Sequence, residues 1–176
     1  MGVKEDMYHP YFRGKQFELL TIRETAQLLA ESSFIPIIEP VRETLTGLGR
    51  ALTAICEADG SAIVVVNPDY GDHSQDGANI SAFLKDEAFG KGNIAAGILL
   101  KEHMGVDDAM KLYEEHNAHA PVFIHSGFSD PKGLAERIGD GIGATKHVFI
   151  AKHCRKLYRK HFKGATRILI GDGFER

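Results

Sequence analysis

Several short apolar runs in this chain stop at a side chain that can do chemistry. Two carboxylates, Glu39 and Asp172, and one imidazole, His125, occupy such positions. A carboxylate can take a proton from a substrate, and a histidine can donate or carry a proton near neutral pH. We therefore take Glu39, His125 and Asp172 as the candidate catalytic residues of an acid–base site.

Most of the other run ends are cationic or polar. They are Arg23, Asn67, Lys101, Lys152 and His153. Arginine and lysine side chains hold phosphate and carboxylate groups. Because cations outnumber carboxylates at the run ends, we expect an anionic ligand that these residues bind. The plainer interpretation is that strands end in polar residues because the chain enters water there.

A second cationic position precedes the first long apolar run. Arg13 and Lys15 flank Gly14 there, and a glycine lets the backbone approach a ligand closely. Arg13 and Lys15 are therefore further ligand-binding candidates. The competing interpretation is a tight turn at Arg13–Lys15 with a salt bridge to Glu18.

Known motifs narrow the chemistry further. The sequence contains no H-E-x-x-H, no paired cysteines, no phosphate-loop frame and no G-x-S-x-G nucleophile elbow. A divalent ion is the weaker alternative, and it would need four residues to meet in space: Glu39, His125, His153 and Asp172. We predict no metal site, and the sequence leaves any cofactor unidentified.

The elements that must position these residues are predicted by the apolar runs themselves. We expect strands at Phe17–Arg23, Phe34–Glu39, Ala62–Val66, Ile94–Leu100, Pro121–His125, His147–Ala151 and Thr166–Ile170. The gaps between them are long enough for helices. Continuous apolar strands that alternate with helices indicate a parallel sheet covered by helices, and the carboxyl ends of parallel strands gather at one rim.

We predict a single α/β domain over residues 1–176, with a capping segment at 1–16 and repeated βα units at 17–176. A polar residue at the end of every strand favours a TIM-like (β/α) barrel, incomplete at about seven strand units, since a complete barrel has eight. The alternative is an open doubly wound parallel sheet, in which only the strands beside the switch point need polar ends.

Composition excludes several classes of function. The net charge of −3 gives no general affinity for nucleic acid, so we expect no nucleic-acid partner. No apolar run approaches the roughly 20 residues of a membrane span, and we expect no membrane partner. The two cysteines, Cys56 and Cys154, have no disulfide or zinc spacing, which is typical of a reducing cytoplasm.

Three segments resemble the phage-type "beta protein" family. They are the opening Tyr8–Glu24 (YHPYFRGKQFELLTIRE), the segment Ile35–Val41 (IPIIEPV) and the closing Ile168–Phe174 (ILIGDGF). The opening segment is the most specific of the three. Family members continue beyond the last segment, so the chain resembles a partial or C-terminally truncated member.

The resemblance implies a phage or genomic-island origin and a role in phage defence or in antagonism of a toxic neighbouring gene product. Such a protein would act through a protein partner. A barrel that lacks a strand would also leave open strand edges, so we expect self-association or completion by another chain. The alternative function is an enzyme that acts on an anionic, phosphate-bearing substrate at the rim.

Overall fold

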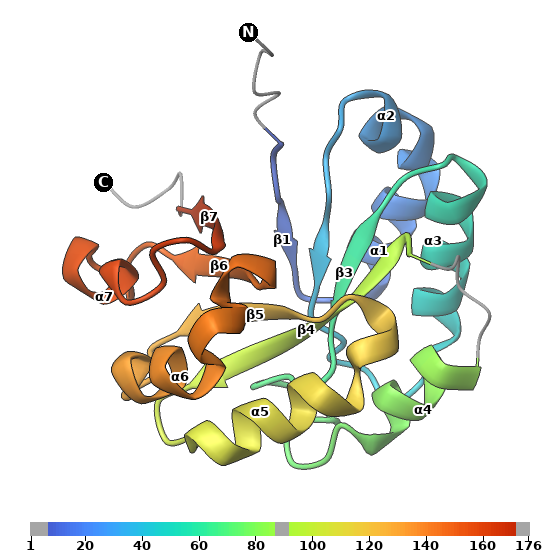
Figure 1. The fold of residues 1–176 in the computed structure, drawn as a ribbon. Helices are drawn as coiled ribbons and strands as arrows, with labels where there is room; N and C mark the ends of the chain where they lie inside the picture. The colour runs from blue at the N-terminus through green and yellow to red at the C-terminus, as the bar shows by residue number, and fades with distance from the viewer. Residues whose placement is uncertain (1–6, 87–91, 172–176) are drawn as a thin grey trace, which may run out of the picture. The chain divides into compact units, whose positions relative to one another are not determined.

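The computed structural model describes residues 7–86 and 92–171 (Figure 1). The described strands form one sheet whose hydrogen-bonded order follows the order of the chain. The strands are β1 (Tyr11–Phe12), β2 (Ile37–Ile38), β3 (Ala62–Val65), β4 (Ile94–Lys101), β5 (Val122–Ser126), β6 (Lys146–Ile150) and β7 (Thr166–Ile170). The pairs β1–β2, β2–β3, β4–β5, β5–β6 and β6–β7 are parallel. The predicted α/β class with a parallel sheet is therefore confirmed.

Helices occupy the connections between the strands. They are α1 (Gln16–Glu24), α2 (Ala26–Glu31), α3 (Thr46–Glu57), α4 (Ala78–Asp86), α5 (Val106–Glu115), α6 (Pro131–Ile138) and α7 (Lys156–Lys160), with 3₁₀ turns η1 (Asn117–His119) and η2 (Gly139–Ala144). At the start of α6, the Asp130 carboxylate accepts a hydrogen bond from the Gly133 N–H, and Pro131 occupies the first turn. No helix in the described ranges is long and apolar enough to span a membrane.

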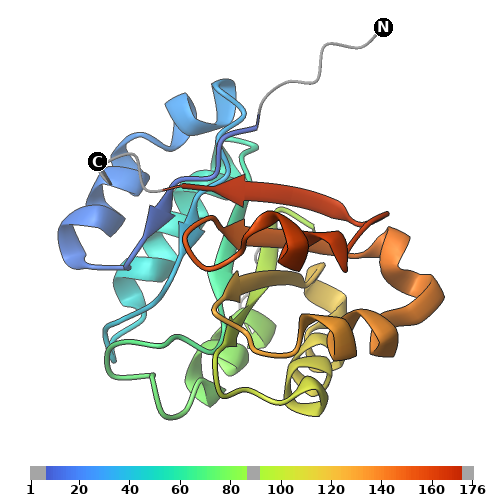
Figure 2. The ribbon, with the colours of Figure 1, turned by 90° about the vertical axis from the view of Figure 1, so that its left-hand side faces the viewer.

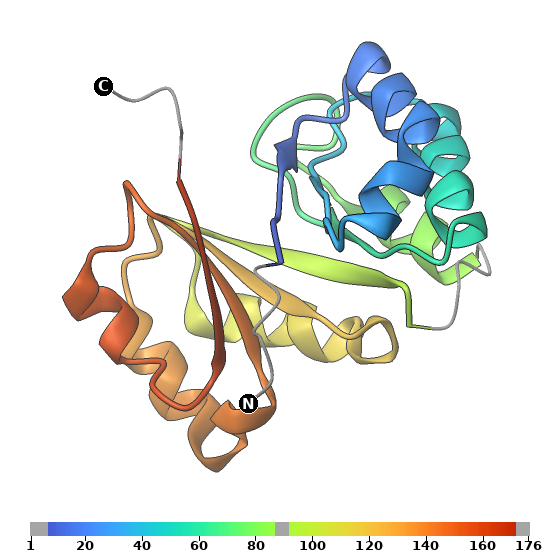
Figure 3. The same ribbon diagram turned by 90° about the horizontal axis from the view of Figure 1, so that it is seen from above.

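The chain divides into two compact units, residues 1–96 and 97–176. Strand β4 crosses this boundary, so its first residues belong to the N-terminal unit and the rest to the C-terminal unit. In the N-terminal unit, α1 and α3 pack side by side (Figure 3). In the C-terminal unit, β6 and β7 run side by side in register (Figure 2).

The predicted strand at 17–23 is wrong, because residues 16–24 form helix α1. In a strand, Phe17, Leu19 and Leu20 would all have been buried. Instead Phe17 is 79% exposed, and Ile22 is the one buried residue of the helix. Leu19 and Ile22 are three residues apart, which places them on one helix face. Leu19 packs near Gly47 of α3, where an added Cβ would lie 3.3 Å from its Cδ1.

The first strand lies instead inside the segment expected to be a cap. Tyr11 and Phe12 pair in register with Ile37 and Ile38 of β2. This shift changes which residues follow a strand end: Arg13 and Lys15 do, and Arg23 does not. Glu18 contacts this segment through a hydrogen bond and not through the expected salt bridge. Its carboxylate accepts from the backbone N–H of Lys15 at 3.2 Å.

Candidate functional sites

Glu39 follows strand β2 and is buried, with 2% of its surface exposed. Its Oε2 accepts a hydrogen bond from the Tyr11 hydroxyl at 2.9 Å, and its Oε1 accepts from the Asp69 backbone N–H at 2.8 Å. A residue of β1 and a residue of the loop after β3 thus meet at the carboxylate that follows β2. Burial, followed by the negative charge of Glu39, raises the pKa of Tyr11 well above its ordinary value.

The loop after β3 is held against the segment that follows β2. The His73 ring hydrogen-bonds the Arg42 carbonyl at 2.9 Å, and the Asp72 carboxylate accepts from the Glu43 N–H at 2.8 Å. Glycine is required at Gly77, because an added Cβ would lie 2.0 Å from the Val66 carbonyl oxygen. Hydrogen bonds and close backbone packing thus tie this loop to the segment that contains Glu39.

Arg13 and Lys15 lie beside this carboxylate site in the N-terminal unit. The Arg13 guanidinium sits 4.6 Å from the centroid of the Tyr70 ring, a cation–π contact. Arg13 is also close enough to Tyr11 to oppose the rise in its pKa. Lys15 is exposed, and Asn67, which follows β3, is partly buried. Four of the predicted residues, namely Glu39, Arg13, Lys15 and Asn67, thus follow the first three strands.

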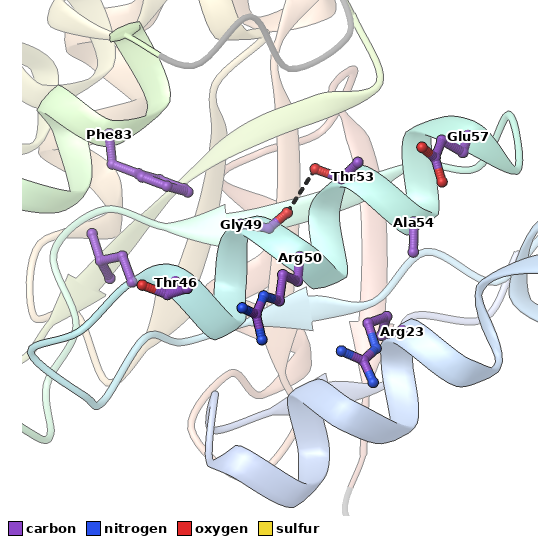
Figure 4. A pocket seen from close by; sticks show the side chains of 9 residues that line it. Arg23, Thr46, Gly49, Arg50, Thr53, Ala54, Glu57 and Phe83 are labelled. Carbon is purple, nitrogen blue, oxygen red and sulfur yellow. Dashed lines mark hydrogen bonds between the residues drawn. The ribbon is translucent and has the colours of Figure 1, made fainter.

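Arg23 is not part of that site. It lies on α1 and lines a groove of about 710 Å³ together with residues of α3 and α4 (Figure 4). Glu39 is not among the residues that line this groove. Arg23 was expected to end a strand; since its segment is a helix, its side chain is carried to a different surface.

In the C-terminal unit, three of the predicted ligand-binding residues lie at or just after strand ends. Lys101 ends β4 and forms an isolated bridge with Gly127, which follows β5. The His153 ring lies near the same glycine, where an added Cβ would be 3.9 Å from its Nδ1. Lys152 and His153 are exposed in the turn after β6. Lys101, Lys152 and His153 thus lie at or just after the carboxyl ends of β4 and β6.

The side chain of His125 does not reach that end. His125 pairs with Phe149 in the sheet register, and Phe123 pairs with His147. Alternate residues of a strand share a face, so these four rings lie on one side of β5 and β6. Rings of α5 and α7 contact that side, and Figure 3 shows α5, α6 and α7 on one side of these strands. The α7 ring of Tyr158 packs edge-on against His125 at 5.4 Å. The expectation that His125 would point into an open rim is therefore wrong.

His125 instead belongs to a chain of hydrogen bonds, here called the histidine chain. It joins Tyr158 Oη to His125 Nδ1 at 2.7 Å, His125 Nε2 to His147 Nδ1 at 2.8 Å, and His147 Nε2 to Thr145 Oγ1 at 2.9 Å. The Thr145 hydroxyl in turn donates to the Ile142 carbonyl at 2.7 Å.

The last acceptor fixes the direction of the whole histidine chain. A carbonyl oxygen can only accept, so Thr145 donates its one proton to Ile142 and must accept from His147 Nε2–H. His147 Nδ1 then accepts from His125 Nε2–H, and His125 Nδ1 accepts from Tyr158. Every ring nitrogen is satisfied with both imidazoles neutral.

Burial supports the neutral state of both rings. It lowers the pKa of His147 to about 3, and it lowers the pKa of His125 well below its ordinary value, with a further contribution from the neighbouring His147. The Phe162 ring, tilted against both histidines at 4.7 Å and 4.4 Å, completes an aromatic enclosure. His125 is 0% exposed, so a substrate has no access to it.

Tyr11, Arg50 and the partners of His125 are not among the residues predicted from the sequence. The sequence does contain a signal for the partners of His125. Phe123 and His125 are two residues apart, as are His147 and Phe149, and residues at this spacing share one face of a strand. Asp172 lies outside the described residues. Within the described ranges, no three His, Cys, Asp or Glu side chains are grouped to hold a metal ion.

Comparisons with protein-family models, curated proteins and solved structures found no match to this chain.

Proposed function

We propose that this chain is a beta-family protein of phage or genomic-island origin, and that it works by binding a protein partner in the cytoplasm as a phage-defence or toxin-antagonist component. The resemblance of three sequence segments supports the family. The choice of binding over catalysis rests on the environment of the two described residues that were expected to do acid–base chemistry.

That environment is closed in both cases. The ring nitrogens of His125 are both occupied within the histidine chain, and the two oxygens of Glu39 are both hydrogen-bonded within the N-terminal unit. A general acid or base must reach the proton that it transfers, directly or through one water. Buried polar groups with satisfied hydrogen bonds are more typical of a specified core. Closure of both sites is the observation that carries the proposal.

We also propose that the sheet is an incomplete TIM-like barrel. In an open doubly wound sheet the strand order reverses at a switch point. Here the order runs from β1 to β7 without a reversal, as successive strands do in a (β/α) barrel. This sequential order supports the barrel over the open doubly wound sheet.

A second candidate is an enzyme that acts on an anionic, phosphate-bearing substrate. Anion-binding side chains follow strand ends within each unit: Arg13 and Lys15 follow β1, and Lys152 and His153 follow β6. Such side chains could clamp a phosphate. This candidate requires a proton-transfer group other than the enclosed His125.

Growth rescue separates the two candidates. Cells would express the toxic product of the neighbouring gene together with wild-type chain, with Glu39→Gln, or with the double variant K152A/H153A. We expect all three proteins to protect the cells equally. Loss of protection by a variant whose circular dichroism spectrum is unchanged would overturn the binding proposal in favour of chemistry at the strand ends.

A further inference from the structure

The groove of about 710 Å³ that contains Arg23 is built on an exposed stripe of helix α3. One face of α3 is buried through Leu48, Leu52 and Ile55. The opposite face presents residues spaced three or four apart, which line the groove: Thr46, Gly49, Arg50, Thr53, Ala54 and Glu57. Such spacing gives one continuous strip along a helix. The volume is within the roughly 300–1,000 Å³ of ligand pockets.

Gly49 and Ala54 leave little side-chain volume in the middle of this strip. Gly49 has no side chain, and an added Cβ there would lie 3.4 Å from the Phe83 ring of α4. Phe83 therefore forms an apolar wall against the strip, and Arg23 of α1 stands on the side of the neighbouring helix (Figure 4). The groove thus combines a flat floor, one aromatic wall and cationic side chains.

Two guanidinium groups face the space between α1 and α3 (Figure 4). Arg23 from α1 and Arg50 from α3 both extend into the space between the helices (Figure 4). Both residues are exposed, and neither forms an ion pair with a carboxylate in the described part of the chain. Two like charges that converge repel one another, and an anion placed between them would relieve this repulsion.

Glu57 gives the groove a second, opposite charge. It lies seven residues after Arg50 on the same face of α3, or about 10 Å along the axis at 1.5 Å per residue. It is in the last turn, where the helix dipole disfavours a carboxylate, and it has no cationic partner within the described residues. A ligand that contacts all three side chains carries a negative group for Arg23 and Arg50 and a positive group for Glu57.

We propose that this groove binds an acidic segment of the protein partner. Carboxylates of the segment pair with Arg23 and Arg50, an apolar side chain packs on Phe83, and a lysine or arginine lies toward Glu57. The aromatic wall and the separated charges suit a peptide better than a small anion, which would use the two arginines alone. This inference rests on the proposed function, since it names the chemistry of the partner.

Fluorescence anisotropy with a labelled peptide tests the groove directly. The probe has glutamates and leucine in one half and lysine in the other, and its control has glutamine in place of each glutamate. We expect wild-type chain to bind the glutamate probe, and R23A/R50A to bind it about tenfold more weakly, as two partly exposed ion pairs allow. The matched control R137A removes an exposed arginine from α6 of the other unit and should leave binding unchanged.

Three results would overturn the proposal. The first is that the glutamine control peptide binds the wild-type chain as tightly as the glutamate probe does. The second is that R23A/R50A binds the glutamate probe as tightly as the wild-type chain does. The third is that inorganic phosphate, added at constant ionic strength, displaces the probe fully. The last result would make the groove a small-anion site. Thermal unfolding of each variant checks that the exposed substitutions leave the fold intact.

The same variants separate failure of the groove from failure of the proposed function. If the wild-type chain protects cells and R23A/R50A protects them equally, the groove assignment is wrong and the protective role stands. If the wild-type chain gives no protection yet binds the probe in an arginine-dependent way, the groove stands and the protective role is wrong.

Discussion

At the scale of single residues, burial decides which ionisable groups can take part in chemistry. His125 and Glu39 are both closed off from substrate, although both follow apolar runs in the way that rim residues do. A polar residue at the end of an apolar run can face either the rim of the sheet or the helices that cover the sheet. One position of register separates the two outcomes, and the sequence alone leaves that register open.

The histidine chain makes stability depend on pH. The folded pKa values of His125 and His147 are lowered, so the unfolded chain binds more protons than the folded chain below an unfolded pKa of about 6.5. Stability is therefore fully present above that pH and falls as the pH drops toward the folded pKa values, and the folded pKa of His147 is about 3. The loss is at most about 1.4 kcal/mol per pH unit for each ring. Urea unfolding at several pH values measures this slope.

A matched pair of variants assigns the slope to these rings. H125F/H147F should flatten it, whereas H161A, which removes an exposed histidine near the end of α7, should leave it unchanged. A slope that persists in H125F/H147F would show that other groups cause the pH dependence.

The thiol of Cys154 should be inert in the folded protein. Burial raises the pKa of Cys154 to about 11, and its Sγ donates to the His125 carbonyl at 3.4 Å. Because the thiolate is the reactive form, we expect iodoacetamide to label the partly exposed Cys56 first and Cys154 only after unfolding. Mass spectrometry of the labelled peptides measures both rates. Labelling of native Cys154 at the rate of unfolded chain would contradict its placement.

At the scale of elements, the strands from β3 onward could be predicted to within about one residue, and the first two could not. Strand β3 is buried at every position, so its sequence is a continuous branched apolar run. Strands β1 and β2 have two residues each, which is too short for a periodic pattern. The apolar residues at 17–22 are spaced in a way that fits either a helix or a strand. The packing of Leu19 on α3 favours the helix.

The loop after β3 depends on close backbone packing, which a single substitution tests. Gly77→Ala would place a Cβ against the Val66 carbonyl, so we expect a loss of about 2–4 kcal/mol in the free energy of unfolding. Gly143→Ala is the control, since nothing lies within 4 Å of an added Cβ there. Denaturant titrations of both variants make the comparison. Equal stability of the two variants would contradict the described loop.

At the scale of the whole molecule, the strand order leaves β1 and β7 as edges, each paired on one side within the described sheet. Strand β7 is poorly covered, and Leu169 in it is 53% exposed. Exposed strand edges promote association. We therefore expect light scattering to show a mass that rises with concentration, and Leu169→Lys to reduce that rise. A monomer at every concentration would contradict this expectation.

The most direct test of the account compares two changes in the growth-rescue assay. Glu39→Gln alters the closed carboxylate that catalysis would require, and R23E/R50E reverses the charge of the groove that binding requires. We predict that Glu39→Gln still protects the cells and that R23E/R50E, folded as judged by circular dichroism, does not. Protection by R23E/R50E, or loss of protection by a folded Glu39→Gln variant, would contradict the account.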